Sequence, residues 1–185
     1  MKDLVVLTAD ADMQAVFRAI LARPDALGIR TIDFEVDRHP GRDSGVFKSG
    51  SELLRAKPKN DFRYFIAAFD HDGSGCHRRW DESGQIIQQR LDSFTFKDRS
   101  TVVVIAPELE EWLWRDPPSI SGASDADRAL APKERLNQVF VKNRKRPARI
   151  QDFAEIAARA NLAAWNSSPS FRILKETLQN WFPAT

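Results

Sequence analysis

Four short runs of mainly apolar residues predict the strands of a β-sheet. Three of them, at residues 4–8, 64–69 and 101–105, are apolar almost throughout, which is typical of strands that are covered on both faces. In the remaining run, at residues 31–36, apolar and polar residues alternate. Because alternation leaves one face to solvent, we predict that this strand lies at an edge of the sheet.

Apolar residues at helical spacing lie between and after these runs. The predicted helices cover residues 13–21, 49–55, 80–94, 132–141, 150–162 and 169–181. Asp10 or Asp12 is placed to cap the first of them. Ser168 followed by Pro169 is typical of the start of the last.

Strands that alternate with helices indicate βαβ units. We therefore expect an α/β fold with a mostly parallel sheet of about four strands and flanking helices. After Pro117 and Pro118 the strand pattern stops and only helical segments follow. The chain is thus predicted to divide into an α/β unit over residues 1–116 and a helical C-terminal extension over residues 117–185, packed on it.

Composition limits the classes of function. The 185 residues are 42% hydrophobic and 29% charged, which suits one globular domain. The 28 Lys and Arg residues nearly balance the 26 Asp and Glu residues, which excludes a protein that binds nucleic acid by bulk charge. One cysteine and three histidines exclude an intrachain disulfide and a zinc ribbon.

Hydropathy along the chain gives no reason to expect a membrane. Apolar runs stay far below the roughly 20 residues that a spanning helix needs. The N-terminus carries Asp3, and its apolar run is too short for a signal peptide. We expect a protein of the cytoplasm.

Acidic residues follow three of the four predicted strands, and ligands of open α/β sheets bind beyond the carboxyl ends of the strands. They are Asp10 and Asp12 after the first strand, Asp70 and Asp72 after the third, and Glu108, Glu110 and Glu111 after the fourth. Carboxylates that converge there would make an oxygen-rich site suited to Mg²⁺ or Mn²⁺. Such a metal can hold a phosphate and activate water.

The strongest signal is Asp70-x-Asp72, because glycines at 73 and 75 would let the backbone bend closely around a ligand. Among the acids after the fourth strand, Glu108 is nearest to the strand. The predicted metal ligands are Asp10, Asp70, Asp72, Glu108 and Glu111, and the first four are also the predicted catalytic residues.

Each of these acids has a structural alternative. Asp10 or Asp12 can serve only as a helix cap. The loop at Asp72 can be an ordinary turn. Acids in the first turn of a helix complement its dipole, and Glu111 can pair with Arg115 four residues later.

Two further segments carry polar side chains suited to a phosphate. Five cations lie within residues 142–149 and are predicted to contact nucleic acid: Lys142, Arg144, Lys145, Arg146 and Arg149. The alternative is a solvated linker between two helices. A polar loop with Arg38, His39, Arg42 and Asp43 follows the second strand, and the glycines at 41 and 45 would let it close over a site.

Over about residues 4–115, the pattern resembles the Toprim superfamily, which includes topoisomerases, primases and the nuclease domains of overcoming-lysogenization-defect proteins. Asp70 and Asp72 match the Asp-x-Asp of that superfamily. The glutamate-glycine usual after its first strand appears here as Thr8-Ala9, with Asp10 and Asp12 just beyond. The resemblance implies a Toprim- or Rossmann-like sheet and a divalent metal, and the departure removes the general acid/base from its expected place.

A second resemblance extends over the whole chain. The motifs that carry it are Asp10-Ala-Asp-Met13, Leu27-Gly-Ile-Arg30, Phe69-Asp-x-Asp-Gly-x-Gly-Cys76, Pro107-Glu-Leu-Glu-x-Trp-x-Trp114, Pro132-Lys-Glu134, Ser167-Ser168, Phe171-Arg172 and Trp181-Phe-Pro183. They are similar to motifs in small bacterial proteins of methylation-associated phage-defence systems. This likeness implies a genetic context more than a reaction.

Two main hypotheses follow. The first is a Toprim-like, divalent-metal-binding protein of phage defence that acts as a metal-dependent phosphodiesterase or nuclease on nucleic acid. The second is a catalytically degenerate sensor or assembly subunit, which would bind other defence-system proteins through the C-terminal helices and the region of Trp112 and Trp114. A third reading is a binder of nucleotides or small phosphates at Gly73 to Gly75.

Overall fold

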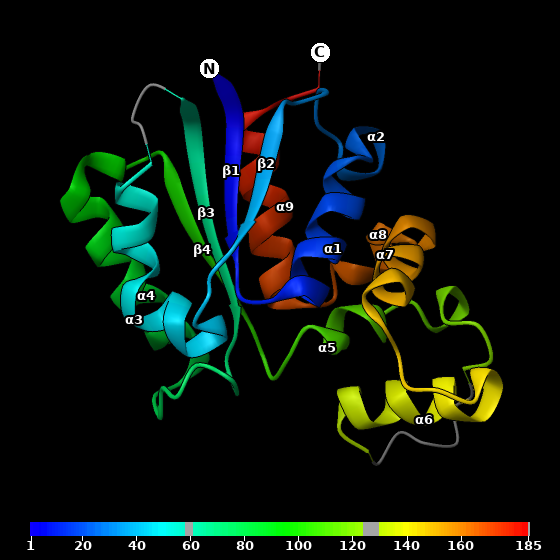
Figure 1. The fold of residues 1–185 in the computed structure, drawn as a ribbon. Helices are drawn as coiled ribbons and strands as arrows, with labels where there is room; N and C mark the ends of the chain where they lie inside the picture. Colours follow the sequence, from blue (N-terminus) through cyan, green and yellow to red (C-terminus); the bar gives the residue numbers. More distant parts are fainter. Residues whose placement is uncertain (58–60, 124–129, 185) are drawn as a thin grey trace.

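The computed structural model describes residues 1–57, 61–123 and 130–184. Its centre is a four-stranded, all-parallel sheet in the order β2-β1-β3-β4 (Figure 1). The strands are β1 (Lys2–Thr8), β2 (Phe34–Arg38), β3 (Phe62–Asp70) and β4 (Ser100–Ile105). The predicted parallel α/β fold is confirmed, and β2 lies at an edge as its alternating pattern indicated.

The edge strand β2 is shifted along the chain relative to its prediction. It begins at Phe34, which pairs with Leu4, and extends to Arg38, which pairs with Thr8. Polar residues can continue a strand whose outer side faces solvent, so the last apolar residue, Val36, does not mark its end.

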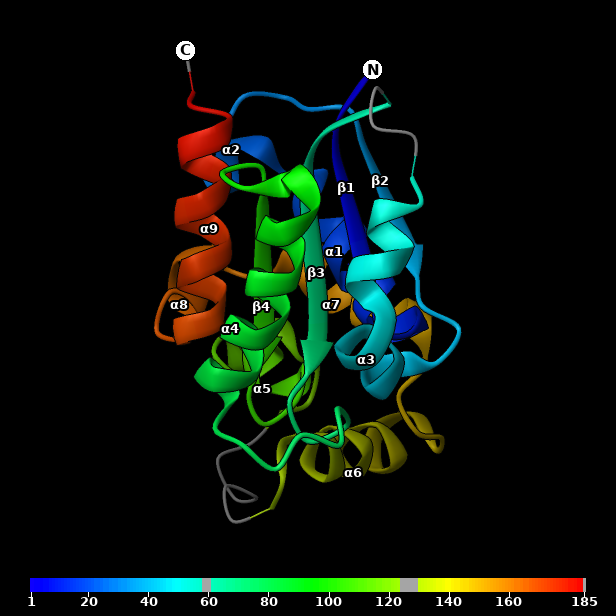
Figure 2. The ribbon, with the colours of Figure 1, turned by 90° about the vertical axis from the view of Figure 1, so that its left-hand side faces the viewer.

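Two layers of helices cover the sheet (Figure 1 and Figure 2). On one face lie α1 (Ala11–Leu21) and α9 (Pro169–Trp181), and on the other lie α3 (Arg42–Arg55) and α4 (Trp80–Leu91). A short helix, α2 (Pro24–Leu27), follows α1, and a π-helical turn over Asp92–Phe96 follows α4. The sheet is therefore buried on both faces, as its apolar strands required.

Helix α3 begins seven residues before the predicted start at residue 49. Its first turn, from Arg42 to Gly45, carries no apolar stripe and includes a glycine, so periodicity does not reveal it. A tertiary contact holds this turn, because the Asp43 carboxylate accepts a hydrogen bond of 2.8 Å from the backbone N–H of Asp70.

The C-terminal region is helical, as predicted. It follows α5 (Glu110–Leu113) and a 3₁₀ turn over Pro117–Ser119. Its helices are α6 (Pro132–Arg144), α7 (Ile150–Arg159), α8 (Leu162–Trp165) and α9. The helix predicted over residues 150–162 ends earlier, at Arg159, and a separate short helix begins at Leu162. Asn161 lies between them and accepts a hydrogen bond from the N–H of Ala163, which caps α8.

One apolar core joins the C-terminal helices to the α/β unit. Helix α7 packs against α1, and α9 packs against β4. The buried ring of Trp112 lies 5.8 Å from that of Phe17 and 5.2 Å from that of Phe171. Within the described residues, no helix is long and apolar enough to cross a membrane.

Candidate functional site

The carboxyl ends of the four parallel strands lie at one edge of the sheet, which is the lower edge in Figure 1. From β1 the chain adds β2 on one side of the sheet and then returns to add β3 on the other side. The direction in which strands are added therefore reverses between β1 and β3. Such a switch point opens a crevice beyond the strand ends where ligands of α/β proteins bind. In the order β2-β1-β3-β4 this switch point falls between β1 and β3.

Asp70 is the last residue of β3, and its carboxyl lies at this edge. Its Oδ1 atom is fully buried and has no hydrogen-bond partner among the described residues. Burial raises the pKa of Asp70 well above its ordinary value, and the charges of Asp43, Glu110 and Asp10 raise it further. A buried carboxylate with an unsatisfied oxygen costs free energy, so this atom calls for a proton or a cation.

Asp43 comes from the first turn of α3 and faces Asp70. Its Oδ1 accepts the N–H of Asp70, and its Oδ2 lies against the glycine loop that follows β3. A Cβ on Gly73 would stand only 2.5 Å from that oxygen, so glycine is needed there for close approach. Burial raises the pKa of Asp43, and the charge of Asp10 adds to the rise.

Glu110 opens α5, and its side chain is buried, with the residue only 5% exposed. Burial raises its pKa to about 7, and Glu108 and Asp12 raise it as well, while its own backbone N–H and Lys133 oppose them. A carboxyl with this pKa exchanges a proton close to neutral pH.

Asp10 and Asp12 stand after β1, as predicted. Asp10 is the N-cap of α1, and its Oδ1 accepts the N–H of Met13 at 2.9 Å. Burial raises the pKa of Asp12, and the charge of Asp10 adds to that rise. Asp10, Asp12, Asp43, Asp70 and Glu110 are therefore one electrostatically linked group, here called the acid cluster.

Two other predicted acids, Asp72 and Glu111, have different surroundings. The side chain of Asp72 is 67% exposed and lies 3.5 Å from Nδ1 of His71. Glu111 forms an ion pair with Arg115, which was the structural alternative for it. The chain turns directly after Asp70, so Asp72 lies in the turn and not in the strand.

Glu108 connects the acid cluster to α6. Its Oε1 accepts the backbone N–H of Lys133 at 2.8 Å, in the first turn of that helix. This contact satisfies one of the N–H groups that a helix start leaves free. Its carboxylate also raises the pKa of Glu110, so Glu108 lies beside the cluster and is tied to a structural contact.

Thr8 occupies the position where the resemblance places a glutamate. It is fully buried, and its hydroxyl donates a hydrogen bond of 2.8 Å to the carbonyl of Asp37 in β2. This side chain joins two strands and carries no acid or base.

A metal was predicted here, and the side chains can be compared with its needs. Within residues 1–57, 61–123 and 130–184, no three His, Cys, Asp or Glu side chains are grouped as a ready set of metal ligands. Mg²⁺ commonly binds through only one or two carboxylates and keeps several waters. The unpartnered Oδ1 of Asp70 and the neighbouring carboxylates fit that mode, whereas an all-protein cage is not formed.

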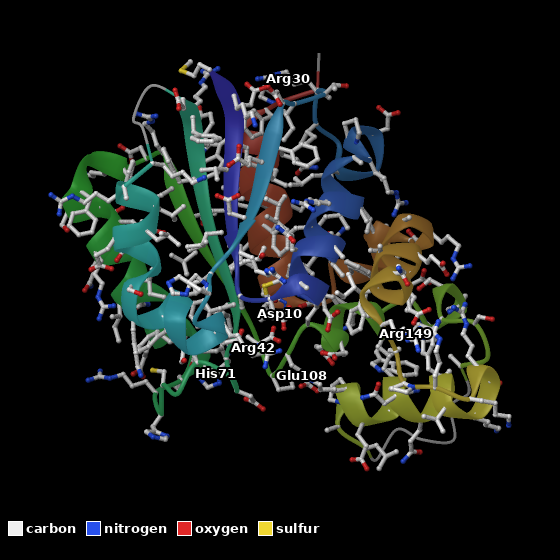
Figure 3. All side chains as sticks on the ribbon, in the orientation of Figure 1. Asp10, Arg30, Arg42, His71, Glu108 and Arg149 are labelled. Atoms are coloured by element: carbon white, nitrogen blue, oxygen red, sulfur yellow. The ribbon has the colours of Figure 1, made fainter. Side chains whose placement is uncertain are left out.

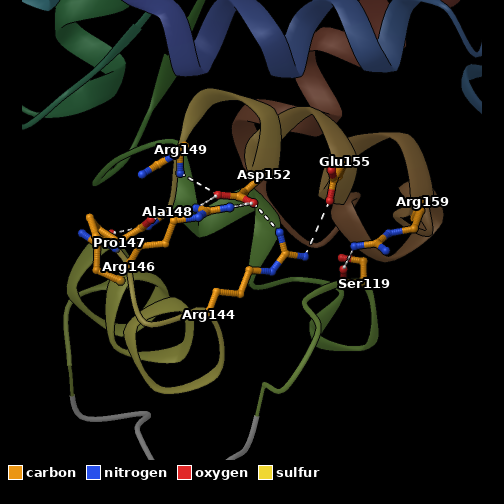
Figure 4. A network of polar contacts seen from close by, with 10 residues as sticks. Ser119, Arg144, Arg146, Pro147, Ala148, Arg149, Asp152, Glu155 and Arg159 are labelled. Atoms are coloured by element: carbon orange, nitrogen blue, oxygen red, sulfur yellow. Dashed lines mark hydrogen bonds and ion pairs between the residues drawn. The ribbon is translucent and has the colours of Figure 1, made fainter.

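The predicted basic segment lies to one side of this edge; in Figure 3 Arg149 is remote from Asp10 and Glu108. Two of its cations hold a buried carboxylate, as Figure 4 shows. Arg144 and Arg146 bind Asp152 at 2.6 Å and 2.5 Å, and Asp152 is 2% exposed. The other three cations, Lys142, Lys145 and Arg149, have no ion pair within the described part of the chain.

Sequence reasoning did not select Asp43 and Glu110. A signal for Asp43 is its place just past the end of β2, which makes it an acid at a further strand end. For Glu110 the signal is the tryptophan four residues later. Residues four apart share a helix face, so an acid on the same face as the apolar Trp114 is expected to be buried, and both residues are buried.

Comparisons with protein-family models, with curated proteins and with solved structures give no match for this chain.

Proposed function

We propose that the acid cluster binds Mg²⁺ or Mn²⁺ and serves the hydrolysis of a phosphodiester in nucleic acid, as the resemblance to Toprim nucleases and phage-defence proteins implies. The observation that carries this proposal is the buried, unpartnered Oδ1 of Asp70 among carboxylates that raise its pKa. A cation would remove both the repulsion and the unsatisfied oxygen.

Asp70 and Asp43 are the residues that would hold the ion, with Asp10 nearby. Their oxygens are hard donors of the kind that Mg²⁺ and Mn²⁺ prefer. When bound, the ion would polarise a phosphodiester and lower the pKa of water. The resemblance places a general acid/base after β1, where this chain has Thr8. Glu110, whose pKa is about 7, would accept and donate the proton in its place.

A second function is favoured by Thr8 and Asp10. The Thr8 hydroxyl bridges β1 and β2, and the Asp10 carboxylate caps α1, so both are occupied by structural bonds. On that basis the alternative is a catalytically degenerate subunit that binds other defence-system proteins. We place either form of the protein in the cytoplasm.

The proposed nucleotide site at Gly73 to Gly75 is less well supported. The Asp43 carboxylate packs against Gly73, and a second anion would be repelled from that position. The loop serves the acid cluster instead.

Titration calorimetry with Mn²⁺ and with Mg²⁺ tests the metal site. Wild type should bind, Asp70→Asn should bind at least about tenfold more weakly, and Asp72→Asn should bind as wild type does. Asp72→Asn is the matched control, because it removes an exposed acid two residues away. Equal binding by wild type and Asp70→Asn would refute the site.

Cleavage of labelled single- and double-stranded DNA and RNA then separates the two functions. Metal-dependent product that disappears in Asp70→Asn and falls in Glu110→Gln supports the hydrolase. Metal binding without product from any substrate supports the degenerate subunit.

A further inference from the structure

A pocket of about 280 Å³ adjoins the acid cluster, between the ends of β1 and β2. Its lining includes Asp10 on the side of the cluster and Arg38, His39 and Arg42 on the side of β2. Arg38 is the last residue of β2, and Arg42 is the first of α3. In Figure 3, Arg42 and Asp10 lie together below the strand ends.

The two arginines of this pocket differ from those of the C-terminal region. Within the described residues, neither the Arg38 nor the Arg42 guanidinium forms a hydrogen bond or an ion pair. Arg144 and Arg146, by contrast, are both bound to Asp152. The pocket therefore presents two sets of N–H donors with no acceptor from the described chain, in the planar form that matches a phosphate.

Arg42 is held beside the cluster by its backbone. Its φ is 53°, a left-handed conformation that residues other than glycine seldom adopt. Its N–H donates to the carbonyl of His39 at 3.2 Å. Burial raises the pKa of Asp12 and of Asp43, and the Arg42 charge opposes the rise in both. The guanidinium thus lies within electrostatic reach of the cluster.

His39 anchors the turn that carries Arg42. Its backbone N–H donates to the Thr8 carbonyl at 2.8 Å, and its Nδ1 accepts the N–H of Gly41 at 2.9 Å. The proton is therefore on Nε2, which lies 3.1 Å from the Ser49 hydroxyl. A Cβ on Gly45 would stand 2.2 Å from Nδ1, so α3 packs directly on the ring. These contacts tie the turn to β1 and to α3.

We propose that the pocket binds a backbone phosphate of the nucleic-acid substrate, with Arg42 as its main contact and Arg38 as the second. The inference rests on the proposed function, because it assigns the substrate-binding part of the same site. Asp10 forms the wall shared with the acid cluster, so the phosphate would lie with the arginines on one side and the proposed cation on the other.

The test measures binding and cleavage separately. The 185-residue protein is titrated into a fluorescent tetranucleotide, and binding is followed by fluorescence anisotropy, first in EDTA and then in Ca²⁺. Inorganic phosphate is then added as a competitor. The main variant is Arg42→Gly, because glycine adopts the left-handed conformation without strain and the fold should be kept. Lys48→Gln is the matched control, since Lys48 is an exposed cation of the same helix.

We expect Arg42→Gly to weaken tetranucleotide binding at least about tenfold, and Arg38→Gln by a smaller factor, while Lys48→Gln binds as wild type does. Competition by inorganic phosphate would show that the pocket takes the phosphate group alone, and its failure to compete would show that a nucleotide chain is required. If Arg42→Gly binds the tetranucleotide as tightly as wild type does, the proposed phosphate site is refuted.

The outcomes separate this inference from the proposed function. Metal-dependent cleavage with an unchanged KM in Arg42→Gly would refute the pocket and leave the hydrolase standing. Arg42-dependent binding in a protein that binds no metal and cleaves nothing would support the pocket and refute the hydrolase.

Discussion

Asp70 and Asp152 are both buried carboxylates, but their surroundings are opposite. Asp152 receives two guanidinium groups and the N–H of Arg149, and its pKa is lowered, first by Arg146. Asp70 has an unpartnered oxygen and acidic neighbours, and burial raises its pKa. Asp152 therefore stabilises the fold through its ion pairs. Asp70 lowers the free energy of unfolding, and a bound cation would offset that loss.

The largest expected effect is on the pH dependence of stability. Glu110 has a pKa of about 7 in the folded protein, against an ordinary value of 4.5. Between these values the folded state holds a proton that the unfolded state has lost. The free energy of unfolding should therefore fall by about 3 kcal/mol as pH rises from 4.5 to 7 without divalent cations.

Urea unfolding across this pH range checks the effect, with Glu110→Gln as the comparison. In Glu110→Gln, the free energy of unfolding should not show the fall that titration of Glu110 causes between pH 4.5 and 7. Burial lowers the pKa of His39, which acts in the opposite direction in both proteins, so the contribution of His39 cancels in the difference between them. That difference reports Glu110 together with its coupling to Asp70, whose pKa the Glu110 charge raises. Asp152 behaves conversely, because its lowered pKa gives stability that is present above pH 3.8 and lost as pH falls below it. Parallel curves for wild type and variant would contradict the role of Glu110.

Removing the charge of Asp152 and removing that of Asp70 should change the free energy of unfolding in opposite directions. Asp152→Ala should lower the free energy of unfolding by about 2 kcal/mol, because it removes charged hydrogen bonds and a cap of α7. Asp70→Asn should raise it by about 1 kcal/mol in EDTA, because repulsion is removed. Chemical denaturation at pH 7 measures both.

Glu155→Gln is the control for Asp152→Ala. Glu155 lies 3.6 Å from Arg144, but its side chain is 54% exposed, so the change should stay within about 0.5 kcal/mol. A loss of stability in Asp70→Asn as large as that in Asp152→Ala would show that the two carboxylates do not differ in the proposed way.

The smallest expected effect is on the salt dependence of nucleic-acid binding, through the two lysines of the basic segment that form no ion pair within the described residues. If nucleic acid contacts this segment, Lys142→Gln and Lys145→Gln should each reduce the slope of log affinity against log salt by about 0.7 to 0.9. Neither should alter stability, since both side chains are exposed. An unchanged slope in the double variant would leave the segment without a nucleic-acid role.

The site was only partly predictable, and the reason differs from residue to residue. Asp10 and Asp70 follow directly from the ends of apolar strands, whose carboxyl ends must share one edge in a parallel sheet. Asp72 is two residues from Asp70, which would share its face in an extended chain, but the chain turns after β3. Asp43 and Glu110 join the cluster only through burial by distant segments.

The amino-acid sequence was enough to predict the elements and the parallel α/β arrangement, because apolar periodicity, caps and chain order act locally or through simple connection rules. It also determined that acids stand at the strand ends. Three features emerge only from the folded structure: which of these acids are desolvated, that Arg144 and Arg146 bind Asp152, and that Arg38 and Arg42 have no partner within the described chain. Desolvation and ion pairing depend on packing between segments far apart in the chain, and spacing along one segment does not contain that information.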